Sequence, residues 1–169
     1  KCLLIEESRQ NLALCNRDLT NAAWGKTSCS VLKNQVGLDG AVEASTVTAS
    51  AANATILQSI SSASNTRITS AYIKRVAGTG TIQMTQDNGG TWTDITSSLT
   101  TSWKRFEVPS ASLSNPTIGF RIASNADAIA VDFVQHELGS FSTSAIATTT
   151  TAVTRQADNA VMTGTNFSS

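Results

Sequence analysis

Short stretches in which apolar and polar residues alternate recur through the middle of the chain, separated by clusters of Gly, Asn, Asp and Ser. Alternation with a period of two places successive side chains on opposite faces of a strand, so each stretch predicts a half-buried β-strand. Many short strands with turn signals between them indicate an all-β sandwich or barrel. The clearest strands are expected at 67–76, 81–86, 91–95, 103–108, 117–122 and 128–135, and weaker ones at 42–47 and 56–60.

The most secure local feature is a hairpin formed by segments 81–86 and 91–95. Ile82 and Met84 share one face of the first segment, and the intervening Asp-Asn-Gly-Gly at 87–90 accepts the positive φ angles of a tight turn. Elsewhere, Pro109 is expected to end the strand that starts at residue 103. Only residues 16–23 suggest a helical turn.

The two ends of the chain differ from its middle. Leu3-Leu4-Ile5 opens the sequence as a strand-like segment, and a run of four threonines at 148–151 has no apolar face to bury. We therefore expect an extended leader over residues 1–16, one domain over 17–146, and a Thr-rich connector to a further domain over 147–169.

Composition removes several functional classes. The 169 residues carry no net charge and only 14% are charged, which argues against a nucleic-acid partner or an acidic membrane surface. No apolar run is long enough to insert into a bilayer. The cysteines Cys2, Cys15 and Cys29 are read as reduced thiols of a protein assembled in a reducing cytoplasm, with a Cys2–Cys15 or Cys15–Cys29 disulfide as the alternative.

The acidic and nucleophilic residues do not predict an enzyme. Glu6 and Glu7 are the only adjacent acidic pair, and on a strand they point to opposite faces, so they cannot act on one substrate as glycosidase carboxylates do. His136 is the single imidazole, and no G-x-S-x-G nucleophile motif occurs.

Six short motifs, taken in order, resemble a recurrent module of phage virion proteins. In such proteins the module is a jelly-roll β-sandwich of two antiparallel sheets, similar to carbohydrate-binding modules. The resemblance spans nearly the whole chain, and the order of the motifs is more specific than any one of them. His136 and Cys15 depart from the usual pattern, which weakens inferences about surface contacts. The motifs are LLIEESRQNL at 3–12, NAAW at 21–24, SAYIK at 70–74, WKRF at 103–106, VDFVQHELGSFSTS at 131–144 and TAVTRQAD at 151–158.

A carbohydrate-binding sandwich stacks aromatic rings on sugar rings and uses nearby polar groups for hydrogen bonds. If Ala71 and Ile73 face the core, their neighbours on the same strand project outward. The alternatives are purely structural roles: Tyr72 would be a partly buried packing residue, and Trp92 would cover the end of the hairpin. The candidate sugar-binding residues are Tyr72, Lys74, Gln83, Trp92 and Arg121.

The resemblance implies a non-enzymatic structural or adhesive module of a tail fibre, baseplate or head fibre, located in the virion. Its partners would be other virion proteins, its own copies in a homotrimer or higher ring, and a host surface glycan. The alternative is an architectural spacer or capsid-decoration element with protein–protein contacts only. A depolymerase activity would belong to another domain. The module requires no cofactor, although such sandwiches often hold a structural Ca²⁺, for which Glu7 and Asp132 are the candidate ligands.

Overall fold

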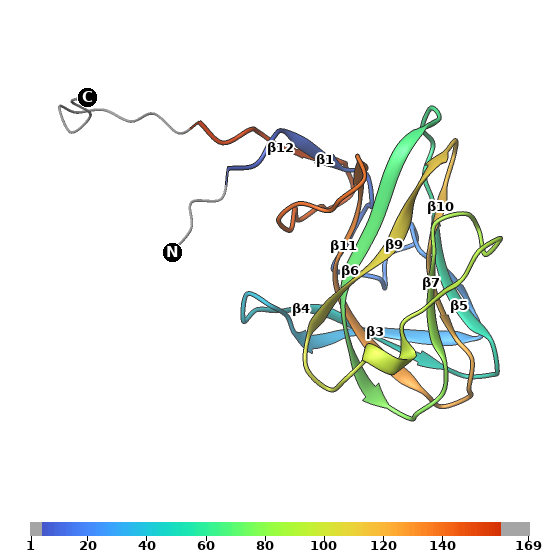
Figure 1. Cartoon of the computed structure of the whole chain (residues 1–169). Coiled ribbons are helices and arrows are strands. Elements are labelled where there is room, and N and C mark those ends of the chain that lie inside the picture. Colours follow the sequence, from blue (N-terminus) through green and yellow to red (C-terminus); the bar gives the residue numbers. More distant parts are fainter. Residues whose placement is uncertain (1–4, 160–169) are drawn as a thin grey trace.

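The computed structural model describes residues 5–159, which form two five-stranded antiparallel sheets and a short two-stranded ribbon (Figure 1). The first sheet has the strand order β2-β5-β10-β7-β8, and the second sheet has the order β3-β4-β11-β6-β9. The strands are β1 (Arg9–Asn11), β2 (Gly25–Thr27), β3 (Cys29–Val36), β4 (Val42–Ala49), β5 (Ala54–Ser59), β6 (Asn65–Ala77), β7 (Ile82–Thr85), β8 (Thr93–Asp94), β9 (Lys104–Leu113), β10 (Thr117–Ile122), β11 (Ala128–Leu138) and β12 (Val153–Arg155).

This architecture confirms the predicted all-β fold of two antiparallel sheets. The strand predicted at 117–122 is β10 with the same bounds, and the one predicted at 67–76 lies within β6. The hairpin of β7 and β8 is also confirmed, with Asn88 at φ 60° and Gly89 at φ 80° in its turn. The described residues include one 3₁₀ turn, Thr96–Ser98, and no helix of a length and apolarity suited to crossing a membrane.

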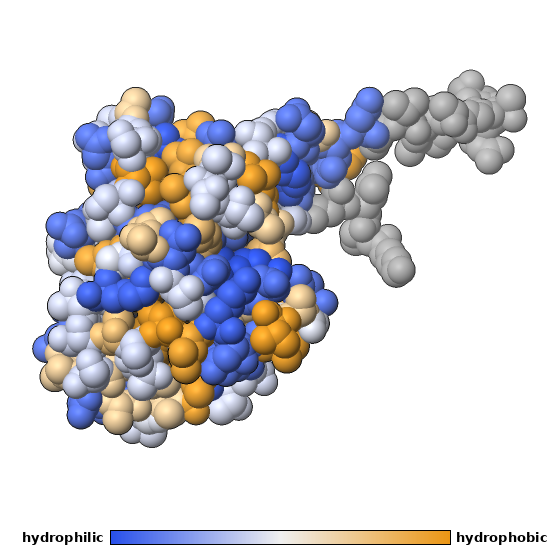
Figure 2. All heavy atoms as spheres, turned by 180° about the vertical axis from the view of Figure 1, so that it is seen from behind, coloured by the Kyte–Doolittle hydropathy of each residue, from blue (hydrophilic) through white to orange (hydrophobic). Residues whose placement is uncertain are grey.

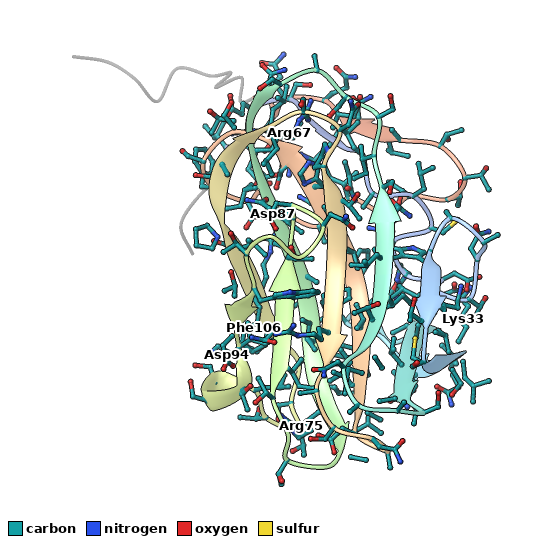
Figure 3. The ribbon with its side chains drawn as sticks, turned by 90° about the vertical axis from the view of Figure 1, so that its right-hand side faces the viewer. Lys33, Arg67, Arg75, Asp87, Asp94 and Phe106 are labelled. Carbon is teal, nitrogen blue, oxygen red and sulfur yellow. The ribbon has the colours of Figure 1, made fainter. Side chains whose placement is uncertain are left out.

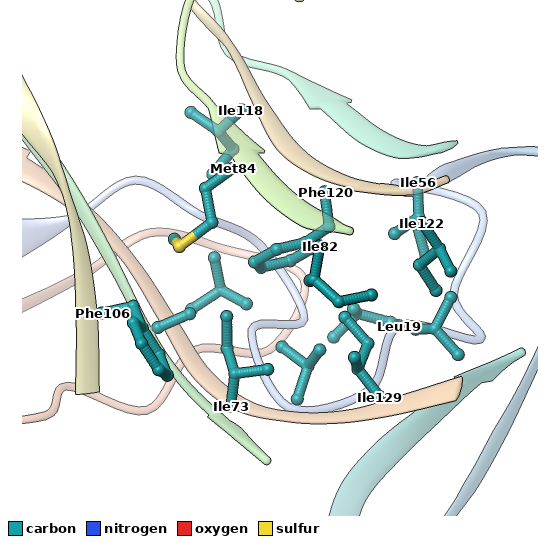
Figure 4. Packing of buried hydrophobic residues seen from close by; sticks show 14 of the residues in the cluster. Leu19, Ile56, Ile73, Ile82, Met84, Phe106, Ile118, Phe120, Ile122 and Ile129 are labelled. Atoms are coloured by element: carbon teal, nitrogen blue, oxygen red, sulfur yellow. The ribbon is translucent and has the colours of Figure 1, made fainter. Parts of the chain in front are cut away.

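The core lies between the two sheets and is built by the alternating positions that the pattern predicted. Figure 4 shows the inward side chains of the first sheet facing those of the second. Trp24 closes one part of this core, 1% exposed and stacked on Phe120 with ring centroids 6.5 Å apart. The fully buried aliphatic residues of the two sheets are Ile56, Ile82, Met84, Ile118 and Ile122 on one side and Val47, Ile73, Ile129 and Val131 on the other.

Pro109 does not end its strand, contrary to the prediction. Strand β9 continues to Leu113 as the edge of the second sheet, and its register with β6 shifts between Arg67 and Thr69. A proline lacks the backbone N–H that a central strand needs, but a bulge on an edge strand does not require that donor. An edge strand therefore accommodates the proline.

Two further predictions need correction. Residues 16–23 form successive turns rather than a helical turn, because the N–H groups of Asp18, Asn21 and Trp24 each donate to the carbonyl three residues earlier. Strand β3 was not predicted at all. Its sequence, CSVLKNQV, is interrupted by polar residues, and most of its side chains are exposed because it is an edge strand.

The two ends of the described chain lie together. Strand β1 pairs antiparallel with β12, so the predicted leader and connector form one ribbon (Figure 1). Residues 11–16, which we assigned to the leader, also pack against the sandwich, with Ala13 and Cys15 in the core. Cys15 and Cys29 are free thiols. Cys2, Leu3, Leu4 and the distal part of the connector lie outside the described residues.

Candidate functional site

A row of polar side chains crosses the outer face of the first sheet. The antiparallel registers place one residue of each strand directly beside the next, from β2 at one edge to β8 at the other. Figure 3 looks onto this face, with Asp94 at its left edge. We call this set the polar row, and its members are Thr27, Thr55, Arg121, Gln83 and Asp94.

Strand alternation explains why these residues share a face. Arg121 stands between the buried Phe120 and Ile122, and Gln83 stands between the buried Ile82 and Met84, so both side chains must point outward. Gln83 and Arg121 were predicted from this alternation. The other three members of the row were not, because nothing in a single strand reveals which residues its neighbours place beside it.

The centre of the polar row is a fixed cluster. The guanidinium of Arg121 donates to Gln83 Oε1 from Nε at 2.7 Å and also from Nη2. It also lies over the ring of Trp92, 4.5 Å from the centroid. The turn before Trp92 comes close because Gly89 has no side chain; an added Cβ would lie 2.8 Å from the indole. Three of the five predicted sugar-binding residues therefore lie together.

The row presents both hydrogen-bond donors and acceptors. Arg121 and the amide nitrogen of Gln83 donate, the two threonine hydroxyls do both, and Asp94 accepts. Asp94 Oδ1 accepts the backbone N–H of Thr96 at 2.8 Å, and this hydrogen bonding lowers the pKa of the Asp94 carboxyl below its ordinary value. One cation and one anion leave the row without net charge.

Beside the polar row, the outer face of the first sheet includes a glycine whose position leaves no space for a side chain. Gly119 lies between Leu57 and Thr85 in the next register position, and a Cβ at residue 119 would lie 2.0 Å from the carbonyl oxygen of Ile56. No other residue fits there without moving the backbone. The half-buried Leu57 side chain takes up this space, since its Cδ2 would lie 2.9 Å from such a Cβ.

A groove of about 250 Å³ opens near this face, between β9 and the β7–β8 hairpin. It is lined by apolar residues of β9 such as Val108 and Pro109 and by polar residues of the hairpin such as Thr91 and Thr93. Its one ionisable residue, Asp87, is already engaged, since Oδ1 accepts from the Thr85 hydroxyl and from the N–H of Thr91, both at 2.8 Å. The groove thus offers no free charged group, whereas the row presents both a cation and an anion.

Tyr72 and Lys74, the other two predicted sugar-binding residues, project from the outer face of the second sheet. Both lie on β6 beside the buried Ala71 and Ile73, as alternation predicted. Arg105 Cζ lies 5.5 Å from the Tyr72 ring centroid, and Lys74 Nζ lies 4.7 Å from that of Trp103. The five predicted residues are therefore divided between the two sides of the sandwich.

The two predicted calcium ligands are each held by a different arginine. Glu7 pairs with Arg9, whereas Asp132 is fully buried and accepts from Arg17 Nε at 2.7 Å and from the N–H of Leu38 at 3.0 Å. A cation at Asp132 would have to displace this guanidinium. Between residues 5 and 159, no three His, Cys, Asp or Glu side chains gather into a set that could hold a metal ion.

The one histidine lies inside the sandwich. His136 is fully buried on β11, and its Nδ1 lies 2.8 Å from the Thr69 hydroxyl, which also donates to Gln86. Burial, together with the nearby Arg67 charge, lowers the pKa of His136 to about 4. The imidazole is therefore neutral near pH 7 and belongs to the interior rather than to an accessible site.

The two antiparallel sheets form a jelly-roll β-sandwich, a fold similar to that of carbohydrate-binding modules. The chain is similar to the CBM22-1 xylan-binding domain from Paenibacillus barcinonensis Xyn10C, with a TM-score of 0.52, 15% identity, and coverage of 79% of this chain and 94% of that one. It is also similar to a variant of CBM29-2 complexed with cellulohexaose, with a TM-score of 0.53, 12% identity, and coverage of 78% and 93%.

A phage protein is among the similar structures. The enzymatically active domain of bacteriophage CBA120 tailspike protein 4 matches with a TM-score of 0.54 and 13% identity over 76% of this chain. The chain spans only 21% of that tailspike chain, so the likeness concerns one part of it. No family model matches the sequence, and no curated protein matches it either. At these identities the similarity shows the fold alone.

Proposed function

We propose that the chain is a non-enzymatic adhesive module that binds a neutral glycan along the polar row of the first sheet. The observation that carries this proposal is the row itself, in which five adjacent strands each contribute one outward polar side chain. Adjacent strands lie about 4.8 Å apart, so the row extends over about 19 Å, enough for several consecutive sugar rings.

The chemistry of the row suits uncharged sugars. Sugar hydroxyls both donate and accept hydrogen bonds, and the row offers both functions with no net charge. Because Arg121 is held by Gln83 and Trp92, little side-chain freedom is lost when a ligand binds. Leu57 and Trp92 add apolar surface beside the polar groups, as sugar rings require.

We further propose that this module belongs to a phage virion protein, such as a tail fibre, baseplate or head fibre. Two observations support that assignment: the ordered motifs at 3–12, 21–24, 70–74, 103–106, 131–144 and 151–158, and the structural likeness to part of a tailspike. Weak binding at each site is sufficient on such a particle, because many copies multiply the effective affinity. Its partners would be other virion proteins and its own copies.

A glycan array probed with the purified 169-residue protein tests the proposal. We expect binding to neutral oligosaccharides that is lost in Gln83→Ala and in Trp92→Ala. Tyr72→Ala, on the opposite face, is the matched control and should bind as the wild type does. Failure of the wild-type protein to bind any neutral glycan, or equal loss in the Tyr72→Ala control, would contradict the proposal and favour a purely architectural role.

A further inference from the structure

The outer face of the second sheet carries two cations that have no carboxylate partner. Lys74 on β6 and Arg105 on β9 form no ion pair with any carboxylate among residues 5–159. Other cations of the chain, such as Arg17 and Arg75, are paired with aspartates. The two unpaired charges are therefore available to a ligand.

Both cations are nonetheless held in place. Lys74 lies on the ring of Trp103, whose Nε1 donates to the Val36 carbonyl at 3.2 Å and fixes the indole to the neighbouring hairpin. Arg105 lies on the ring of Tyr72 and donates to the Ser70 hydroxyl from Nη2 at 2.9 Å. Because these contacts orient the side chains, an anion would bind them with a smaller entropy cost than it would bind free surface lysines.

The same face places a third donor between the two cations. Tyr72 is the direct cross-strand neighbour of Arg105 and lies two residues from Lys74 along β6, about 7 Å away. The Tyr72 hydroxyl, the Lys74 ammonium and Arg105 Nη1 donate no hydrogen bond to a described residue. We call Tyr72, Lys74 and Arg105 the donor patch.

No nearby carboxylate among the described residues forms an ion pair with this patch. Asp132, beside Tyr72 in the register, is completely buried and bound by Arg17. Glu107, two residues beyond Arg105 on β9, keeps its charge but makes its hydrogen bond with the Ser142 hydroxyl instead of with Arg105 or Lys74. Lysine and arginine side chains offer donors and no acceptors, so the patch is matched to anionic oxygens and differs in this respect from the polar row.

We propose that the donor patch binds the carboxylate or phosphate groups of an acidic polysaccharide, on the opposite side of the sandwich from the polar row. Two unpaired cations and a zero net charge are too few for a nucleic-acid backbone, where many phosphates must be neutralised together. A polysaccharide with one anion per sugar or per repeat presents its charges more sparsely, which two cations can match. This second site does not depend on neutral-glycan binding.

Isothermal titration of the 169-residue protein with three polymers tests the site. Polygalacturonate carries carboxylates, its fully methyl-esterified form is the uncharged match, and phosphomannan carries phosphates. We expect binding to at least one polyanion, no binding to the ester at this patch, and weaker binding as salt increases. The double variant Lys74→Gln/Arg105→Gln should weaken polyanion binding about tenfold or more, since charge-assisted hydrogen bonds are lost.

Matched variants separate this site from general charge and from the first face. Lys33→Gln removes one positive charge from a lysine already paired with Glu43 and should retain polyanion binding, as should Gln83→Ala. Thermal unfolding of each variant checks folding, and Lys74→Gln alone should give a smaller loss in the same direction. In Gln83→Ala, which lacks the neutral-glycan row, equal binding of the ester and the polyanion would overturn the proposal. Equal loss in Lys33→Gln, no binding to either polyanion, or tighter binding of single-stranded DNA titrated in the same way would each overturn it as well.

Discussion

The two outer faces of the sandwich are built by the same strand alternation but present different chemistry. The first sheet exposes the polar row, in which Arg121 donates hydrogen bonds to Gln83. The negative charge of Asp94 balances the positive charge of Arg121 in that row. The second sheet exposes hydrogen-bond donors that include two cations without a carboxylate partner, Lys74 and Arg105. The aspartate beside them, Asp132, is buried under the turn between β3 and β4. One scaffold therefore offers one neutral and one cationic surface, and a binding result for one face does not predict the other.

The large exposed apolar side chains lie on the second sheet and toward the ends of the chain, and none of those in the described residues lies on a strand of the first sheet. Figure 2, which shows the molecule from behind, has exposed apolar groups scattered between polar ones rather than one continuous apolar area. The exposed residues Leu32, Val36 and Val42 come from the β3–β4 hairpin at the edge of the second sheet. These apolar residues lie at the edge and ends of the second sheet, so the contrast between the polar row and the donor patch is one of charge and hydrogen bonding.

The largest expected loss of stability comes from a substitution at Gly119, on the outer face of the first sheet. Gly119→Ala places a Cβ 2.0 Å from the Ile56 carbonyl oxygen, so the backbone must move, and we expect a loss of about 3 to 4 kcal/mol in the free energy of unfolding. Gly25→Ala, in the same register row, is the control because its Cβ would lie 3.6 Å from the nearest atom. Urea unfolding measures both. Similar losses in the two variants would refute the role given to Gly119.

The contacts that hold the β3–β4 turn over Asp132 on the second face should contribute nearly as much to stability. Asp132→Ala leaves Arg17 partly buried with one carboxylate fewer and the N–H of Leu38 without its acceptor, so we expect a loss of about 3 kcal/mol. Asp39→Ala removes the exposed carboxylate of the same arginine and should cost much less, because water screens an exposed ion pair. Chemical denaturation distinguishes them, and a reversed order would show that the exposed pair stabilises the turn.

The buried His136 of the second sheet should make the stability of the protein depend on pH. Folding keeps His136 neutral with a pKa of about 4, whereas the unfolded chain takes up its proton below about pH 6.5. Stability is therefore complete above pH 6.5 and falls as the pH decreases toward 4, by about 2 to 3 kcal/mol. Urea unfolding over this range tests the prediction. His136→Phe should abolish the slope, and an unchanged slope would assign it to other groups.

The smallest effects are expected at the exposed residues of the two binding surfaces. Lys74→Gln loses a cation–π contact and Gln83→Ala loses two surface hydrogen bonds from Arg121, so each should change the free energy of unfolding by less than about 1 kcal/mol. Differential scanning calorimetry is sufficient to measure this. A larger loss in either variant would mean that its binding defect reflects folding, which would remove the contrast between the faces.

Much of the fold could be predicted from the sequence because the central strands have a strict apolar alternation. Strand β10 and the β7–β8 hairpin are examples, and the outward positions of Gln83 and Arg121 followed from them. Strand β3 was missed because an edge strand has no need of that alternation. The prediction that the strand ends at Pro109 was wrong for a related reason, because β9 is also an edge strand and accommodates a proline.

The candidate sites required information that one strand does not contain. Thr55 and Asp94 join the polar row only through cross-strand register, and the separation of Tyr72 from Trp92 depends on which sheet each strand enters. Trp103 precedes β9, and its indole lies under Lys74 on the outer face and donates to the Val36 carbonyl, a contact that the local sequence does not reveal. Pairing and topology, rather than local pattern, decide these positions.

The antiparallel ribbon of β1 and β12 has a mechanical consequence. Both flanking segments leave the sandwich at the same end, so tension applied across them would open the ribbon like a zipper. The rungs Arg9↔Arg155, Gln10↔Thr154 and Asn11↔Val153 would then break one after another rather than share the load. The ribbon, with the Glu6–Arg155 ion pair at its outer end, would yield first, and the jelly roll behind it would keep its shape under a moderate pull.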